Sequence, residues 1–531
     1  MAKYTRNDLT GLLSAVNVEL EKIENSLADK LDREPSVAQA NSMGNLLDMN
    51  SQRITNLAAP SNLNDAARLR DVQSASTEAI LPPQEGQGGK YLTTDGSGTF
   101  WEDVDTTIQY VDTFSNLQAL EPEDTNDSFI CLERANAHYV LQASGYAALS
   151  GDVTFANGRV GALQFTKTAI AEKFGVTYSG DETVLLQSII DRVANTGGEI
   201  VLSALVNVSG ITIPQRVVLK GVDYGFANQF IDNEVSPKGS GLFLITGSDS
   251  DVVTLKLAVT LSDGDLVDDY DGTINNDYRY FGGLKDLVVY GNRSDTANPP
   301  SVVDNNTSGN GVAVKGVRYP ILHNVVIMMC AEDGFTCDSF DYGLGSNACN
   351  NHDFDNVICL SNAVNGASLS GGDAIMRKII AGYNGNNGIT STSGSGSITG
   401  ECWNNQNHGI QISGGKRITY DFASYDNKVN GWRITDTKGV TCRGSANANG
   451  RDTGQGAGQR VGVLTGDSNE GLVLNINSDG SDGVTTYQAY GFNISNASNP
   501  IVVAGCFATN NFSSDWLITT PANIIKDTNA P

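Results

Sequence analysis

The feature that most constrains the fold is a pair of residues that repeats in the second half of the chain, an Asn followed four positions later by a Gly. The four copies are Asn362/Gly366, Asn384/Gly388, Asn405/Gly409 and Asn427/Gly431. They follow one another at intervals of 22, 21 and 22 residues, and a fixed period of this size predicts a solenoid. We expect the Asn residues to form a purely structural ladder, because Asn tolerates a left-handed turn and its amide can bond to the equivalent amide one rung away.

The residues around each Gly have the polarity of strands that bury one face. After the Gly, the first and third residues are mostly apolar and the second is polar, as in residues 410–412, which is the period of two of a half-buried strand. A second strand precedes the Gly, with inward residues nine and seven positions before it. The Gly signal extends back to Gly311 and Gly334 and, at longer intervals, forward to Gly462 and Gly491. Each rung is therefore predicted to contribute two strands.

The composition favours a turn-rich β architecture, since the 531 residues include 58 Gly but only 17 Phe, 18 Tyr and 4 Trp. The formal net charge of −26 argues against nucleic acid and anionic membranes as partners, because both require a basic surface. The sequence contains no signal-peptide core and no apolar run of membrane length, so we expect folding in a reducing cytoplasm and no membrane insertion. The eight Cys lack CxxC spacing and are expected to be buried free thiols. Neither a metal nor a cofactor is predicted.

Four regions are predicted along the chain. Residues 1–34 carry an apolar seam of near-heptad spacing, which favours a parallel trimeric coiled coil over a surface helix packed on its own domain. Residues 35–106 are polar and rich in Pro and Gly, as expected of linkers and small turns. Residues 107–165 alternate short β-prone runs with turns and predict a small β neck module. Residues 166–531 form the solenoid.

A helix over residues 183–195 is expected to cover the open end of the solenoid, since an exposed end would leave a sheet edge open to water. Val184, Leu185, Ile189 and Val193 are predicted on its buried face, with Asp181 as the N-cap. Strands are predicted directly after it.

Two stretches resemble a known protein family. The run Ser179-Gly180-Asp181-Glu182-Thr183, followed by Gly197-Gly198 and Ile200-Val201-Leu202, resembles the opening segment of pectate-lyase-like parallel β-helices. The segments 47–57 and 89–101 look like virion-proximal parts of bacteriophage tail fibres and tailspikes. The resemblance implies a mainly β protein in which a right-handed parallel β-helix follows an N-terminal helical and small-β virion-attachment region. It further implies a homotrimer that is made in the bacterial cytoplasm, held by phage tail or adaptor proteins through its N-terminus, and located in the virion tail.

Many proteins of this type cleave host polysaccharides, and the sequence offers one carboxylate pair for such a reaction. Glycoside hydrolysis needs two carboxyl groups roughly 5 to 9.5 Å apart. Glu401 and Asp421, on neighbouring rungs, should both face outward with their Cα atoms roughly 8 Å apart. Lys378 is predicted in the same column as Asp421, where it could hold an anionic sugar. The alternative is that these charges only solubilise the sheet, and the aspartate, Gly-His-Gly and Arg-Ile-Lys signature of polygalacturonases is not reproduced.

Aromatic residues and two long turns indicate where a sugar would bind. Tyr383, Trp403 and Tyr425 fall in the same turn on three successive rungs and predict a strip on which sugar rings stack, unless they merely close the turn. Extra residues enter this turn at 446–460 and 478–488. They bring Arg451 and Asp452, and then Asp482.

Three functions remain open from the sequence. The preferred hypothesis is a phage tailspike or tail fibre that attaches the virion to a host surface polysaccharide. The alternatives are a depolymerase, either a glycoside hydrolase or a lyase, that cleaves capsule or lipopolysaccharide, and a purely structural tail component.

Overall fold

The protein is described from a computed structural model. It covers residues 90–94, 99–103 and 108–526, the last range without 124–126, 224–238, 257–281, 294–305, 342–345, 348–351, 495–498, 520–523 and single or paired positions between 307 and 484. The predicted coiled coil at 1–34 and most of region 35–106 lie outside the described residues. Within region 35–106, β1 (Lys90–Thr94) and β2 (Thr99–Asp103) pair as an antiparallel hairpin.

A five-stranded sheet occupies the region in which a small β module is predicted. Its order is β3-β4-β5-β7-β6, with β3 and β4 parallel and the other pairs antiparallel. The elements are β3 (Ile108–Val111), α3 (Phe114–Gln118), β4 (Ser128–Cys131), β5 (Ala137–Leu141), β6 (Val153–Thr154) and β7 (Val160–Gln164). Phe129, Tyr139 and Leu117 are fully buried, and they belong to the same apolar cluster as the core of the solenoid.

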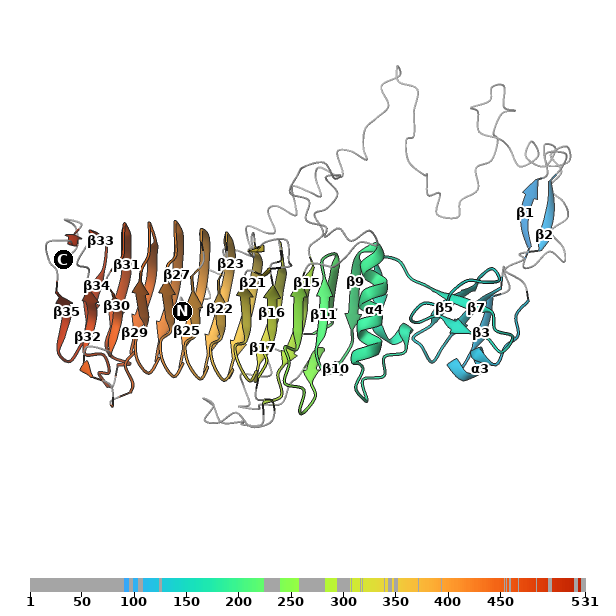
Figure 1. Ribbon diagram of the computed structural model, residues 1–531, viewed down its shortest axis with the longest axis horizontal. Coiled ribbons are helices and arrows are strands. Elements are labelled where there is room, and N and C mark those ends of the chain that lie inside the picture. The colour runs from blue at the N-terminus through green and yellow to red at the C-terminus, as the bar shows by residue number, and fades with distance from the viewer. Residues whose placement is uncertain are drawn as a thin grey trace, which may run out of the picture. The chain divides into compact units, whose positions relative to one another are not determined.

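Helix α4 (Thr183–Thr196) covers the first strands of the solenoid (Figure 1), and a 3-10 helix, η1 (Ala171–Phe174), precedes it. The buried residues of α4 include Leu186, Ile189 and Val193. Val184 is 84% exposed, so its predicted burial was wrong: the buried stripe lies one residue further round the helix, through Leu186 and Ile190. Asp181 accepts a bond from the Thr183 N–H (3.0 Å) but the N-cap position is occupied by Glu182, which corrects the predicted cap by one residue.

The solenoid is a parallel β-helix, as predicted, because every strand pair in its two main sheets is parallel and each strand pairs with its equivalent one rung away (Figure 1). In the described residues, the long-strand sheet has 16 members. They are β8 (Thr168–Ile170), β9 (Gly198–Leu202), β10 (Leu205–Val208), β12 (Val217–Gly221), β13 (Gly241–Leu244), β15 (Gly283–Tyr290), β17 (Ile321–Met328), β21 (His352–Leu360), β23 (Ala374–Gly382), β25 (Gly396–Trp403), β27 (Ile418–Tyr425), β29 (Thr441–Asn447), β31 (Leu472–Asp479), β33 (Ile501–Val503), β34 (Phe507–Thr509) and β36 (Ile524–Lys526).

The short-strand sheet faces the long-strand sheet across the core and has 11 members in the described part of the chain. They are β11 (Ile211–Pro214), β14 (Val253–Lys256), β16 (Val312–Lys315), β18 (Phe335–Asp338), β22 (Ala367–Leu369), β24 (Ile389–Ser391), β26 (Ile410–Ser413), β28 (Trp432–Thr435), β30 (Val461–Thr465), β32 (Tyr490–Ile494) and β35 (Ser514–Ile518). A small antiparallel pair, β19 (Phe340–Asp341) and β20 (Ser346–Asn347), follows β18. Two turns therefore complete each regular rung: the ladder turn, which follows a long strand (404–409 in the rung of β25), and the lead-in turn, which precedes one (414–417 before β27).

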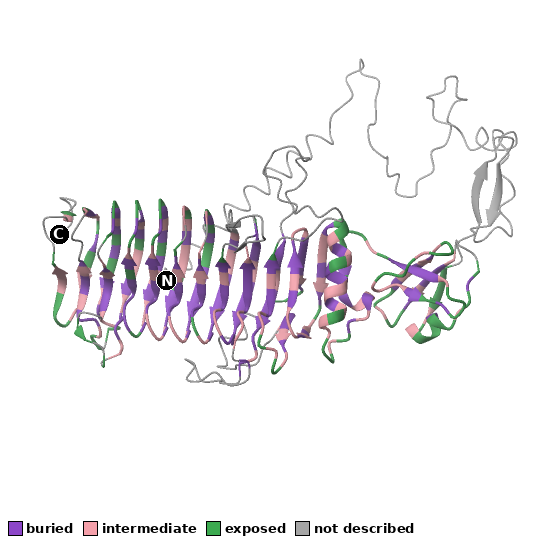
Figure 2. Cartoon of the chain, in the orientation of Figure 1, coloured by how far each residue is buried: buried purple, intermediate pink, exposed green. Residues whose placement is uncertain are grey.

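The core lies between the two sheets, where the inward columns are buried as predicted (Figure 2). Phe422 and Trp432 from opposite sheets meet edge to face with ring centroids 6.2 Å apart. All seven Cys that the structure describes are free and buried, so they pack as small apolar side chains. No helix in the described ranges is long and apolar enough to span a membrane.

The Asn ladder is present as predicted. In each step, the Oδ1 of one Asn accepts bonds from the backbone N–H and the side-chain amide of the Asn one rung earlier. Asn405 illustrates this: it accepts from Asn384 (3.1 and 2.9 Å) and donates to Asn427 (2.8 Å) and to the Ala381 carbonyl (3.1 Å). The ladder continues to Asn449, which accepts from Asn427 at 3.2 and 2.8 Å. It thus satisfies buried polar groups in the turn that would otherwise lack partners.

A second ladder, which the sequence analysis missed, occupies the residue directly before each Gly. Asp333 accepts from the backbone N–H and side-chain amide of Asn365 (2.8 and 3.0 Å). Asn365 and Asn387 in turn accept from the backbone N–H groups of Asn387 and His408, each at 3.1 Å, and Asn430 contacts His408 Nδ1 at 3.3 Å. Burial, together with a neighbouring guanidinium, lowers the pKa of His408 to about 3, so this residue is neutral in the ladder.

The outer face of the long-strand sheet also carries apolar side chains, which form a second cluster outside the core. We call it the outer apolar cluster; its members are Val288, Tyr290, Val326, Met328, Met329, Ile358, Leu360, Ile380 and Trp403. Ile358 and Ile380 occupy the outward column in which polar residues such as Glu401 are found on later rungs. This one outward column therefore loses its large apolar side chains at β25.

Candidate functional site

The two predicted catalytic carboxylates lie on the outer face of adjacent strands. Glu401 on β25 pairs with Ala423, and Asp421 on β27 pairs with Thr399, so the carboxylates are offset by two residues along neighbouring strands. Both residues are exposed. This is the arrangement from which a Cα separation of roughly 8 Å was expected.

Tyr425, at the end of β27, ties Glu401 to the ladder turn. Its hydroxyl donates to Glu401 Oε2 at 3.3 Å. Burial and the Glu401 carboxylate both raise the pKa of Tyr425, so its phenol remains a hydrogen-bond donor at neutral pH. The pair holds Glu401 toward the turn side of the sheet.

Tyr383, Trp403 and Tyr425 lie close together at the ladder turn, but their side chains are not equally exposed to solvent. Trp403 is only 9% exposed and belongs to the outer apolar cluster, because its ring lies over Gly382, where a Cβ would clash with it at 2.6 Å. Tyr383 meets the Trp403 ring edge-on with centroids 4.8 Å apart. Tyr383 and Tyr425 are partly buried and flank this ring. The Trp403 ring therefore closes the turn. The side chains of Tyr383 and Tyr425 remain as the aromatic surface available to a ligand.

The two long turns bring Arg451 and Asp482 together, two of the three residues singled out there from the sequence. Arg451 pairs with Asp426 and lies 3.5 Å from the Asp482 carboxylate. Its guanidinium carbon stands 4.6 Å from the centroid of the Tyr487 ring, and the Tyr487 hydroxyl donates to Asp482 at 3.2 Å. Asp426 and Tyr487 were not anticipated, since spacing alone does not show how two irregular loops meet.

The backbone fixes these loops on the rigid ladder turn. The N–H of Gly450, at φ 80°, donates to the Asn427 carbonyl (2.8 Å), and the N–H of Asp452 donates to the Lys428 carbonyl (2.9 Å). In the next loop, the buried amide of Gln488 donates to the Ala446 carbonyl at 3.0 Å. Arg451 is thus held by anchored backbone, whereas Asp482 begins a tight turn, in which its N–H bonds to the Thr485 carbonyl at 3.3 Å, at the end of a small hairpin.

Lys378 lies in the predicted column, at an irregularity in the pairing of β23 with β25. Its φ is 55° and its N–H donates to the Thr399 hydroxyl at 3.1 Å, so the exposed ammonium sits on a bulge beside β25. The preceding rungs carry an ion-pair cluster that the sequence pattern did not indicate, in which Arg377 bonds Asp353 at 2.9 Å and His323 approaches the same carboxylate at 3.2 Å. The outer face of the sheet therefore carries charged side chains on both sides of Tyr383, Trp403 and Tyr425.

No group of three or more His, Cys, Asp or Glu side chains that could hold a metal ion occurs in the part of the chain that is described. The groups available for chemistry are carboxylates, cations and phenols. Such groups can bind the hydroxyls and charged substituents of a sugar, or act as acid and base.

No protein-family model matches the sequence, and no curated protein matches it significantly. Similar solved structures include the A-module of a mannuronan C-5 epimerase from Azotobacter vinelandii (15% identity, 68% of this chain and 100% of that chain, TM-score 0.45). Tailspike protein 2 of an Escherichia coli O157:H7 bacteriophage is another (13% identity, 81% and 60%, TM-score 0.49). A third is the tailspike of Acinetobacter baumannii bacteriophage Fri1, described as a capsular polysaccharide depolymerase (14% identity, 79% and 70%, TM-score 0.35).

Several of the similar structures are phage tailspikes, the class to which the sequence resemblance points. The chain spans about three fifths of the length of the Escherichia coli phage tailspike. At identities of 13 to 15% the likeness concerns the fold alone, and one fold serves many functions. Function must therefore be argued from this chain's own residues.

Proposed function

We propose that this chain is a bacteriophage tailspike or tail fibre whose β-helix attaches the virion to a polysaccharide of the host surface. The observation that carries the proposal is the meeting of Arg451, Asp482 and Tyr487 from two anchored loops, next to Tyr425 on the same edge of the solenoid. Sugars are recognised by planar donors, carboxylate acceptors and aromatic faces. All three occur here, on a rigid scaffold and on the longest turns of the regular rungs.

The proposal extends to the assembly. We place residues 1–34 in a trimeric coiled coil, 35–106 in contact with phage tail or adaptor proteins, 107–165 in a neck, and 166–531 in the receptor-binding β-helix. The virion tail is the corresponding location. Sedimentation of the purified chain as a monomer would contradict the trimer.

A depolymerase is the second candidate, and the position of Glu401 and Asp421 favours it over a purely structural role. Both carboxylates are exposed on the outer face, within one rung of each other and beside the proposed binding edge. A chain bound along Tyr383 and Tyr425 would pass over this face. In that case Glu401 and Asp421 would share the roles of acid and base, or of acid and nucleophile.

One experiment separates the three functions. The purified protein is incubated with capsular polysaccharide and with lipopolysaccharide from bacteria to which the virion adsorbs, and retention and products are both measured. Retention without new chain ends supports attachment, while new reducing ends or unsaturated sugars support the depolymerase. Absence of both retention and cleavage would refute the proposal in favour of a structural component.

The residues are tested in the same assay. Arg451→Gln should weaken retention at least about tenfold. Lys256→Gln, which removes an exposed cation at the end of β14 far along the chain from the site, should not change it. Equal retention by both variants would show that the polysaccharide binds at another site on the protein.

A further inference from the structure

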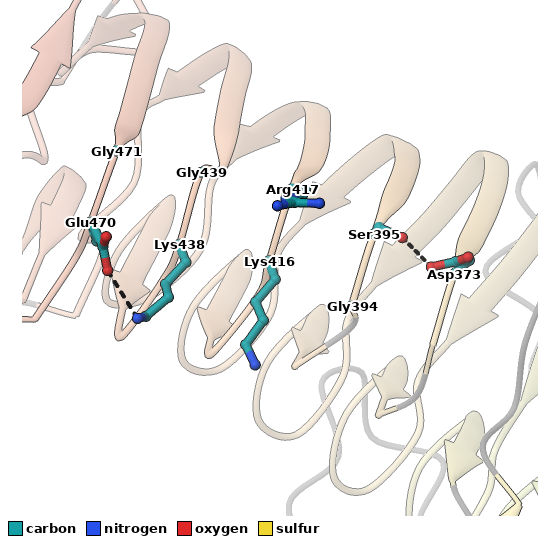
Figure 3. A pocket seen from close by; sticks show the side chains of 9 residues that line it. All are labelled: Asp373, Gly394, Ser395, Lys416, Arg417, Lys438, Gly439, Glu470 and Gly471. Carbon is teal, nitrogen blue, oxygen red and sulfur yellow. Dashed lines mark hydrogen bonds and ion pairs between the residues drawn. The ribbon is translucent and has the colours of Figure 1, made fainter.

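A second surface feature lies at the other end of the same long strands. The lead-in turns before β23, β25, β27, β29 and β31 line an open groove with a volume of about 650 Å³ (Figure 3). Strand β27, eight residues long, separates this groove from Tyr425 and the ladder turn. At about 3.3 Å per residue the separation is roughly 26 Å, so the groove is distinct from the site described above.

The groove concentrates positive charge on a chain whose net charge is −26. Lys416, Arg417 and Lys438 line it and are exposed. Lys438 is neutralised by Glu470, with Nζ and Oε2 2.9 Å apart, and the Asp373 carboxylate on the same wall accepts a bond from the Ser395 hydroxyl. Within the described residues, the side chains of Lys416 and Arg417 make no hydrogen bond or ion pair. The groove therefore keeps two cations available to a ligand.

The stacking of these cations is unfavourable without a counter-ion. Lys416 lies directly opposite Lys438 on the next rung, and Lys438 lies opposite Glu470 on the rung after that. Adjacent parallel strands are only about 4.8 Å apart, and like charges placed opposite one another destabilise a sheet. Glu470 offsets one of the two ammonium groups, so the ammonium of Lys416 is the group that an external anion would offset.

The backbone at Arg417 supports a role for its side chain. Arg417 has φ 53°, and the equivalent residues of the next two rungs are Gly439 and Gly471, with φ 62° and 65°. Gly adopts this conformation without the steric cost that a side chain brings, and a non-Gly residue held in it suggests a function. The column is not crowded, because the nearest atom to a Cβ built on Gly439 would be the Cγ of Arg417, at 3.8 Å.

We propose that Lys416 and Arg417 bind carboxylate groups of a polysaccharide that contains hexuronate residues. The guanidinium fork matches a carboxylate in two-bond geometry, and the neighbouring ammonium adds a point charge. The groove runs across successive rungs, so an extended chain can lie along it with one of its carboxylates at Lys416 and Arg417. The inference deepens the proposed function and rests on it for the claim that the anion belongs to a host glycan.

The test measures the affinity of a labelled oligogalacturonate for the full chain. The variants are the double substitution Lys416→Gln with Arg417→Gly, which gives residue 417 the Gly of the next two rungs, and the control Lys256→Gln. We expect the double variant to bind at least about tenfold more weakly, the wild type to weaken as salt rises, and the control to match the wild type. A free energy of unfolding equal to or higher than that of the wild type shows that the backbone of the double variant is intact, since the substitutions remove a like-charge contact and the steric cost of a side chain at position 417.

Three results would overturn the inference: equal affinity of the double variant and the control, equal affinity of the wild type for a neutral dextran oligosaccharide, or displacement of the oligogalacturonate by inorganic phosphate at matched charge concentration. The last result would assign the groove to small oxyanions. Failure of the proposed function is separately visible, because host polysaccharide would then not be retained while oligogalacturonate still binds through Lys416 and Arg417.

Discussion

Replacing Asp333 by Asn should stabilise the protein at neutral pH, because Asp333 is the acidic member of a ladder otherwise built largely from amides. Burial raises the pKa of Asp333 from 3.8 to about 6, although the Asn365 backbone and side-chain N–H groups oppose the rise. Since the folded-state pKa is the higher one, the stability that the protonated form contributes is fully present below pH 3.8 and is lost as pH rises through 6. Two pKa units correspond to about 3 kcal/mol.

Asp333→Asn keeps the Oδ1 that accepts both bonds from Asn365, and its new amide can donate to Asn310, whose Oδ1 already accepts the residue 333 N–H at 3.2 Å. The variant therefore behaves as a carboxyl group that never ionises. At pH 8 it should exceed the wild type in free energy of unfolding by about 3 kcal/mol. At pH 4.5, where folded Asp333 is largely protonated, the advantage should shrink by about 2 kcal/mol.

Urea unfolding followed by tryptophan fluorescence, at pH 4.5 and pH 8, measures both differences. Asp436→Asn makes the same chemical change at an exposed turn residue and should shift stability little at either pH. A pH-independent effect of Asp333→Asn, or destabilisation at pH 8, would refute the assignment of a raised pKa to this ladder position.

Three further predictions concern the ladder and the site. Asn405→Ala should destabilise by about 4 kcal/mol in urea unfolding, since it removes the interior bonds that Asn405 makes with the Asn384 N–H and the Ala381 carbonyl. The half-buried Asn407→Ala, which loses one bond, should cost at most about 1 kcal/mol, and equal losses would contradict a special role for the ladder. If the chain cleaves glycan, Glu401→Gln should lower the cleavage rate at least about 100-fold while retention persists, and intact cleavage would eliminate Glu401 as a catalytic group. Tyr425→Phe should weaken glycan retention only about two- to tenfold, through the loss of one hydrogen bond, and complete loss would point to misfolding, which unfolding curves would reveal.

The period of the sequence was sufficient to predict the rungs, because each rung repeats the same turn and the same two buried columns. It located the ladder from Asn362 to Asn427 but missed Asn449, where the inserted loop moves the following Gly to position 462. The second ladder had a visible signal, since Asn365, Asn387 and Asn430 each directly precede a Gly. That signal was overlooked because only the Asn four positions before the Gly was followed.

The candidate site was only partly predictable. Residues on regular strands, such as Glu401 and Asp421, could be placed by counting along the repeat. The contacts of Arg451 with Asp426 and Tyr487 could not, because irregular loops have no period and their path depends on where their backbone bonds to the turn. The burial of Trp403 was also missed, since it depends on Gly382 and on an outer apolar cluster that no inward column indicates.

The central claim is that the β-helix binds a host surface polysaccharide at the edge where Arg451 meets Asp482. Its most direct test is the equilibrium binding of the wild type, Arg451→Gln and Lys256→Gln to immobilised polysaccharide from a bacterium to which the virion adsorbs. The account predicts saturable binding by the wild type and by Lys256→Gln, and at least about a tenfold loss for Arg451→Gln. Saturable binding of equal strength by all three proteins, or no binding by the wild type, would contradict it.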